Sequence, residues 1–137
     1  MTGVTGGTVA GTGLERMRDA MWEEPWYEDG VLEAGDVGLA HRHHGERDPL
    51  GHTQWREGRR IGVLHGAVTN WDELSVGTPG LFERLLDDPV ALLPKLEGPF
   101  ALVAADGAAD RVVLATDKLG ARPLYYAREP FAFASGL

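Results

Sequence analysis

Histidines are the first residues of this chain that suggest chemistry. Four of its five histidines lie close together, at His41, His43, His44 and His52. On a strand, His41 and His43 would share one face about 7 Å apart. A zinc site would need a third protein ligand beside them. The alternative is a polar strand end, and we expect neither a metal nor another cofactor.

Other residues exclude whole classes of site. The chain has no cysteine, which excludes disulfides, thiolate metal sites and a cysteine nucleophile. The stretch Gly11-Thr12-Gly13 matches a phosphate-binding loop only in part, since Arg16 stands where the third glycine belongs. We interpret the larger aromatic residues as core or interface residues, namely Trp22, Trp26, Tyr27 and Trp55.

Size and charge narrow the function further. The chain has 137 residues, enough for one domain spanning 1–137. It carries 13 Lys+Arg against 21 Asp+Glu, a formal net charge of −8. The basic cluster Arg56, Arg59 and Arg60 is too short for a nucleic-acid stripe. The apolar runs are too short to span a bilayer, and the N-terminus lacks a signal-peptide layout. We therefore expect a cytoplasmic protein that binds neither nucleic acid nor membrane.

The first half of the chain reads as strands around one helix. Small and β-branched residues predict a strand over residues 2–10. Thr12 and Glu15 form a capping-box pattern for a helix that ends before Pro25. Short strands are predicted at residues 31–32 and 37–41, then a loop at 44–58 with at most a short strand, then a strand at 61–64.

The second half begins with helices and ends in strands. Asn70 or Asp72 could cap a short turn, Pro79 opens a helix, and Pro89 restarts it. Strands are predicted at residues 100–105, 112–116, 124–127 and 131–134. Helices segregated from antiparallel strands predict a layered α+β domain rather than alternating βαβ units.

Several blocks of the sequence resemble one known family. Residues 117–126 read DKLGARPLYY, similar to a D-x-x-G-x-K-P-L-Y-Y block. Residues 96–106 read LEGPFALVAAD, residues 65–74 HGAVTNWDEL, residues 133–135 FAS, and the N-terminus MTGV. In this order and spacing they resemble the glutaminase domain of asparagine synthetase, a class II glutamine amidotransferase of the N-terminal nucleophile hydrolase type.

The resemblance implies both a fold and a reaction. The implied fold is α+β, a four-layer α-β-β-α sandwich of two antiparallel sheets, here expected to be shortened at the C-terminus. The implied reaction converts glutamine to glutamate and ammonia, which a synthetase domain or subunit then consumes. We expect a stand-alone domain without the synthetase part. Its candidate partners are glutamine and a synthetase subunit, and the sequence is compatible with an oligomer.

The resemblance also assigns site residues. After removal of Met1, Thr2 would supply a hydroxyl nucleophile and the α-amine that serves as its base. Gly3 follows it, and His65 and Gly66 occupy the oxyanion-hole positions. Substrate-binding candidates are Arg42, His43 and Ala67, although direct alignment puts His43 where the family has its carboxylate-binding arginine.

Three functional hypotheses stay open at this point. Thr2 stands where the family has cysteine, and the amine-binding acidic block aligns with residues 76–79, which have no carboxylate. The chain is then a glutaminase with a threonine nucleophile, a non-catalytic scaffold or regulatory partner of a synthetase, or an amide hydrolase for another substrate. In the non-catalytic case Thr2 merely begins a buried edge strand.

Overall fold

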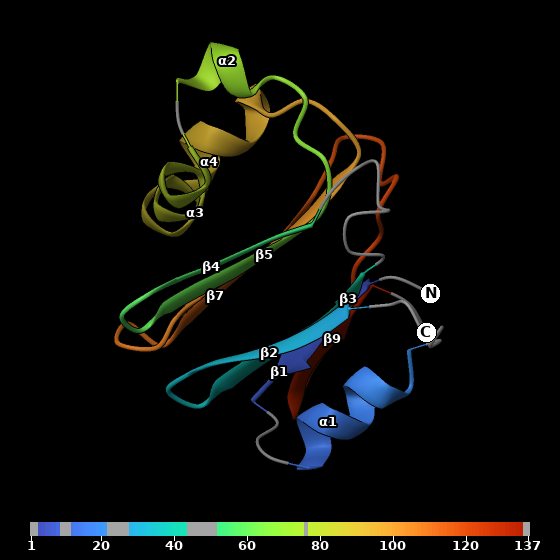
Figure 1. Ribbon diagram of the computed structural model, residues 1–137. Coiled ribbons are helices and arrows are strands. Elements are labelled where there is room, and N and C mark those ends of the chain that lie inside the picture. The colour runs from blue at the N-terminus through green and yellow to red at the C-terminus, as the bar shows by residue number, and fades with distance from the viewer. Residues whose placement is uncertain (1–2, 9–11, 22–27, 44–51, 76, 136–137) are drawn as a thin grey trace.

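The computed structural model describes residues 3–8, 12–21, 28–43, 52–75 and 77–135 (Figure 1). In the described part of the N-terminal half there are one helix and five strands: β1 (Gly3–Gly7), α1 (Thr12–Asp19), β2 (Glu28–Ala34), β3 (Val37–His43), β4 (His52–Glu57) and β5 (Arg60–Gly66). Short helices and four strands follow: α2 (Trp71–Leu74), α3 (Thr78–Asp87), α4 (Pro89–Leu92), the 3-10 turn η2 (Leu93–Lys95), β6 (Phe100–Asp106), β7 (Arg111–Thr116), β8 (Tyr125–Arg128) and β9 (Phe131–Ala134).

The strands form two antiparallel sheets. The five-stranded sheet has the order β2-β3-β1-β9-β8, and the four-stranded sheet has the order β4-β5-β6-β7. Strand β1 therefore lies at the centre of its sheet, between β3 and β9. The expectation that the N-terminal segment is an edge strand is wrong, because β9 returns from the end of the chain to pair with β1. Residue 2 itself lies outside the described residues.

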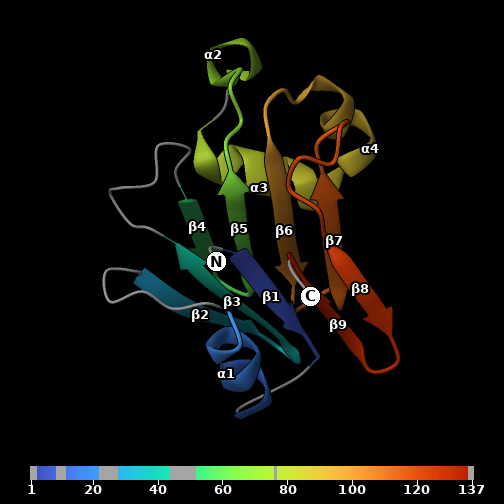
Figure 2. The same ribbon diagram turned by 90° about the vertical axis from the view of Figure 1, so that its right-hand side faces the viewer.

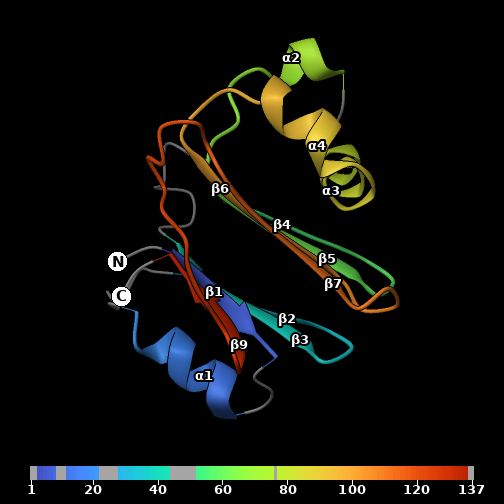
Figure 3. The same ribbon diagram turned by 180° about the vertical axis from the view of Figure 1, so that it is seen from behind.

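The helices complete a four-layer arrangement. Helix α1 covers the outer face of the five-stranded sheet, and α2, α3 and α4 lie over the outer face of the four-stranded sheet (Figures 1 and 3). The two sheets face each other between these helical layers. The α-β-β-α sandwich expected from the sequence is confirmed. No helix in the described ranges is long and apolar enough to cross a membrane.

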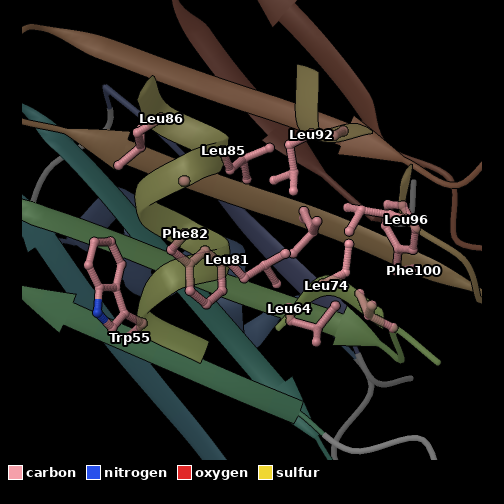
Figure 4. Packing of buried hydrophobic residues seen from close by; sticks show 14 residues of the cluster. Trp55, Leu64, Leu74, Leu81, Phe82, Leu85, Leu86, Leu92, Leu96 and Phe100 are labelled. Carbon is pink, nitrogen blue, oxygen red and sulfur yellow. The ribbon is translucent and has the colours of Figure 1, made fainter. Parts of the chain in front are cut away.

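Two apolar cores hold the layers together. The first fills the space between the sheets and is built from β1, β3, β5, β6 and β9, with Val4, Leu39, Val63, Val103 and Phe133 among its members. The second lies between the four-stranded sheet and the helices (Figure 4). This division follows from strand geometry, since alternate residues of β5 and β6 face opposite layers.

Trp55 and Phe82 form an aromatic contact in the second core. Their ring centroids are 5.5 Å apart and their planes differ by 8°, so the rings are stacked. Trp55 is 7% exposed, which confirms its interpretation as a core residue. Trp22, Trp26 and Tyr27 lie outside the described residues.

Strand β4 is the main departure from the predicted elements. The sequence predicted a loop at 44–58 with at most a short strand, whereas residues 52–57 form a full strand of six residues. Each of them pairs with β5, from His52 opposite His65 to Glu57 opposite Arg60. This pairing joins strands through tertiary contacts. Because β4 is an edge strand with charged residues, its sequence lacks the apolar pattern from which a strand is predicted.

Candidate active site

Two of the candidate catalytic positions, Gly3 and Gly66, lie at the same end of the two facing sheets. Gly3 begins β1, and Gly66 ends β5 in the facing sheet. The start of β1 and the end of β5 both lie toward the same side of the molecule (Figures 1 and 2). Two segments far apart in sequence thus reach the same end of the inter-sheet layer. Thr2 lies outside the described residues, so its placement stays a prediction.

His65 faces the inter-sheet layer. In β5, Ile61 and Val63 belong to the core between the sheets, whereas Leu64 belongs to the core under the helices. Alternation along the strand places His65 on the same face as Val63. Its exposed fraction is 4%, so it is a buried polar residue at the predicted oxyanion-hole position.

A second buried histidine, His41, faces the same layer from the other sheet. It shares the face of Val37 and Leu39 in β3 and is 3% exposed. Its Nε2 lies 2.8 Å from Oε1 of Gln54 in β4, a hydrogen bond that joins the two sheets. The sequence left His41 as either a metal ligand or part of a polar strand end. The structure gives it a role in joining the sheets at the candidate site.

The segment after His65 turns sharply. Gly66 has φ of +97°, in the region that favours glycine. The next amide, Ala67 N–H, donates to the carbonyl oxygen of Pro99 at 2.9 Å, and Thr69 N–H donates to that of Glu97 at 2.8 Å. Ala67 is half-buried. The segment predicted to form the oxyanion hole is therefore held by backbone hydrogen bonds to residues 97–99, which belong to the LEGPF block.

Asn70 fixes the same junction through its side chain. It is 8% exposed; its Nδ2 donates to Lys95 O at 2.7 Å, and its Oδ1 accepts from Glu97 N–H at 3.0 Å. Asn70 occupies the N-cap position of α2 but makes no side-chain cap bond there. Of the two residues predicted to cap this turn, Asn70 therefore does not do so with its side chain, because Lys95 O and Glu97 N–H take both ends of its amide group.

Asp117 organises the neighbouring loop. Its Oδ1 accepts from Leu119 N–H at 2.9 Å, and its Oδ2 accepts from Ala121 N–H at 3.0 Å and Phe100 N–H at 3.3 Å. Burial opposes ionisation of this carboxyl, but the backbone donors, Arg122 N–H among them, outweigh burial and lower its pKa. The aspartate that begins the DKLGARPLYY block thus serves as an anion that folds the loop.

Ser135 ties the end of the chain to its beginning. Its Oγ accepts from Val4 N–H at 2.9 Å, and its own N–H donates to Val4 O at 2.8 Å. The FAS block therefore supports the strand on which Thr2 would lie. Sequence reasoning used this block only as part of the resemblance, and its link to β1 becomes visible only through the β1–β9 pairing.

Arg42 lies on the opposite face of the five-stranded sheet. Its Nη1 donates to Met21 O at 2.9 Å, and its Nη2 forms an ion pair with Asp29 Oδ2 at 3.0 Å. The side chain is 2% exposed. This is the α1 face, because the neighbouring His41 faces the other sheet. For His43 the structure describes only the backbone, the last residue of β3, opposite Glu28.

Metal-site geometry is not found among the residues described. No three His, Asp or Glu side chains gather there as a group that could hold an ion. Of the four clustered histidines, only His41 has a described side chain. A shallow pocket of about 370 Å³ does lie beside the site, lined by residues 96–99, residues 117–119 and Ala121.

Comparison with known proteins supports the resemblance seen in the sequence. No curated protein matches the chain. Residues 80–137 match the family described as a glutamine amidotransferase domain. The matched range contains three of the blocks singled out in the sequence, at 96–106, 117–126 and 133–135. Together with the two-sheet sandwich, this match confirms the resemblance of the chain to the class II glutamine amidotransferase domains.

Proposed function

We propose that this chain is a domain related to the glutaminase domain of asparagine synthetase that serves as the non-catalytic partner of a synthetase and does not hydrolyse free glutamine. The observation that carries the proposal is the orientation of Arg42. Recognition of an α-carboxylate normally relies on a bidentate guanidinium. Arg42 faces helix α1 and is already paired with Asp29, so it is turned away from the layer that His65 and His41 face.

The residues that build the frame support the same proposal. Asn70, Asp117 and Ser135 each make several hydrogen bonds that hold the strand ends and loops around the candidate site. Positions expected to bind the charged groups of glutamine differ from the family. A scaffold role needs the frame but not those charged groups.

The test is ammonia release from glutamine. Intact mass of the native protein first establishes whether Met1 has been removed, since a retained Met1 blocks the α-amine that would act as base. The native chain and its Thr2→Ala and Thr2→Cys variants are then assayed side by side. We expect all three to release ammonia at the background rate. Release by the native chain well above that of Thr2→Ala would overturn the proposal.

The Thr2→Cys variant separates two reasons for inactivity. A thiol is intrinsically more nucleophilic than a hydroxyl. If Thr2→Cys hydrolyses glutamine with a micromolar to millimolar KM, the binding pocket is intact and only the nucleophile is silenced. That result would contradict the argument from Arg42. Inactivity of Thr2→Cys supports the absence of a glutamine-binding site.

A second candidate function is hydrolysis of an uncharged amide with Thr2 as nucleophile. The geometry of Gly66 favours it, because the strand ends there on a backbone turn of the kind that can present an N–H to an oxyanion. In this reaction the Thr2 hydroxyl attacks the amide carbon while the α-amine takes the hydroxyl proton, and the resulting α-ammonium returns that proton to the leaving ammonia. Water then hydrolyses the ester left on Thr2, which releases the carboxylic acid and restores the hydroxyl. Ammonia release from propanamide by the native chain but not by Thr2→Ala would support this second function.

A further inference from the structure

The four edge strands of the sandwich differ in their protection against pairing with another chain. Charged side chains, prolines and short length normally protect an edge strand. Strand β2 reads EDGVLEA and carries three carboxylates, β4 ends in an Arg-Glu pair, and β8 has only four residues. Strand β7 reads RVVLAT, with its single charge at the first residue. Among the described edges, β7 is therefore the least protected.

The outer edge of β7 is available for pairing. On its inner side β7 pairs with β6 from Ala101–Thr116 to Asp106–Arg111, and on its outer side no described strand pairs with it. Val112, Val113 and Leu114 are already half-buried against the two cores. The unprotected part of β7 is thus chiefly its backbone, whose N–H and C=O groups would bind another strand.

A groove lies next to this edge. It measures about 520 Å³, and Val112, Leu114, Tyr126 and Phe131 contribute to its lining. Strands β7 and β8 lie on the same side of the sandwich (Figure 2), and residues of both strands line the groove. A strand added to β7 would extend the apolar surface that forms one wall of the groove.

We propose that β7 pairs with β7 of a second copy of this chain, antiparallel about a two-fold axis at Val113. The two four-stranded sheets would then join into one sheet of eight strands. Residues opposite each other across an antiparallel pair point to the same face. A two-fold axis perpendicular to the sheet puts the helix-covered faces of both copies on the same side of the joined sheet. Odd-numbered residues must then lie opposite odd-numbered residues, and even-numbered opposite even-numbered ones.

This register is self-complementary. Val113 lies opposite its own copy on the helix-covered face, Val112 lies opposite Leu114 on the inter-sheet face, and Arg111 lies opposite Ala115. Pairs of β-branched and aliphatic residues stabilise neighbouring strands, whereas like charges directly opposite destabilise them. The register centred on Val113 contains no like-charge pair. Isologous contacts of this kind are the commonest in homo-oligomers.

Charge also favours pairing of a second copy at this edge over β2 and β4, which carry carboxylates. The chain carries a net charge of −8, so two copies repel each other at long range. Strand β7 contains no carboxylate, and its pairing buries no ion pair that salt would weaken. Salt screens the repulsion between the two copies. Association through β7 should therefore be weak at low ionic strength and stronger at high ionic strength.

A single introduced cysteine tests the pairing and its register. The native chain has no cysteine, so Val113→Cys gives one thiol per copy. Directly opposite Cα atoms in an antiparallel pair lie about 4.5–5.5 Å apart, within the range that a disulfide spans. Val31→Cys on edge strand β2 is the matched control, because Val31 is 39% exposed and also lies on an edge strand.

The expected result is rapid formation of a disulfide-linked dimer by Val113→Cys under mild oxidation, at least about tenfold faster than by Val31→Cys and faster still in high salt. Equal rates for the two variants would overturn the proposal. If the true partner of β7 is an extended segment of another protein, this chain stays monomeric and the two variants again form disulfides at equal rates, which also overturns the proposal. If Val113→Cys does not fold, hydrogen exchange of native β7 decides: slowing of its amides with rising protein concentration supports the proposal, and concentration-independent exchange overturns it.

Discussion

The carbonyl oxygen of Pro99 lies against the backbone of Gly66, on the side where any other residue would carry its side chain. A Cβ at position 66 would sit 2.1 Å from that oxygen. The same oxygen accepts the N–H of Ala67 at 2.9 Å. Strand β5 can therefore end at the candidate oxyanion hole only if residue 66 is glycine and the 97–99 segment is in place.

Replacing Gly66 by alanine should strongly destabilise the fold. The Cβ meets backbone rather than a movable side chain, and φ of +97° is unfavourable for alanine. We expect a loss of about 2–4 kcal/mol in the free energy of unfolding. Gly58→Ala is the matched control: it also has positive φ, but nothing lies within 4 Å of its Cβ position. Urea denaturation compares them, and equal losses would contradict the importance of Pro99.

Removing the Asn70 amide should loosen the junction between α2 and β6. Asn70→Ala leaves Lys95 O and Glu97 N–H without their partner inside the protein. Each lost bond to a buried group costs about 1–2 kcal/mol, so a total of about 2–3 kcal/mol is expected in urea denaturation. Thr69→Ala, an exposed neighbour, should change stability by less than about 0.5 kcal/mol. A similar loss of stability in both variants would refute the idea that the Asn70 side chain holds the 95–97 turn in place.

Asp117 should make stability depend on pH below about pH 4. Its folded pKa is lowered, because backbone donors outweigh the opposing effect of burial. The carboxylate therefore contributes stability that is fully present above its unfolded pKa and is lost as pH falls through its folded pKa. Asp117→Asn should be less stable than the native chain at pH 7, and the difference in stability between the two proteins should become smaller toward pH 3.

Thermal unfolding of both proteins between pH 7 and pH 3 measures this narrowing. Asp72→Asn on the surface of α2 is the control, since Asp72 is exposed. The Asp72→Asn curve should run parallel to that of the native chain. A constant gap between Asp117→Asn and the native chain would show that the Asp117 charge does not stabilise the loop.

Arg42 should stabilise the folded protein through its buried contacts. Arg42→Met removes a buried guanidinium and leaves Asp29 and Met21 O without it, with an expected cost of about 3 kcal/mol. Arg18→Met is the matched control, because Arg18 also pairs with Asp29, at 3.7 Å, but is 25% exposed. Its cost should stay below about 1 kcal/mol. Equal costs in urea denaturation would contradict the structural role of Arg42.

Local pattern reading predicted most elements but missed those that depend on distant partners. The residues of β6, β7 and β9 show clear strand composition, and Pro79 correctly predicted the first turn of α3. The region of β4 was expected to be a loop with at most a short strand, because its polar residues gain strand structure only by pairing with β5. Asn70 was expected, as an alternative to Asp72, to cap a helix, because its partners Lys95 O and Glu97 N–H are distant in sequence.

The sequence by itself determined the fold class and the family resemblance, because apolar periodicity and ordered motifs are local properties of the chain. It also excluded cysteine chemistry through composition alone. Strand alternation also predicted that Arg42 points away from the position aligned with His43, unless the register slips by one residue. Only the tertiary structure decided that Arg42 pairs with Asp29, that β1 is central, and that Ser135 and Asp117 hold the strands and loops of the candidate site. The physical reason is that strand register and partner choice are set by contacts between residues far apart in sequence.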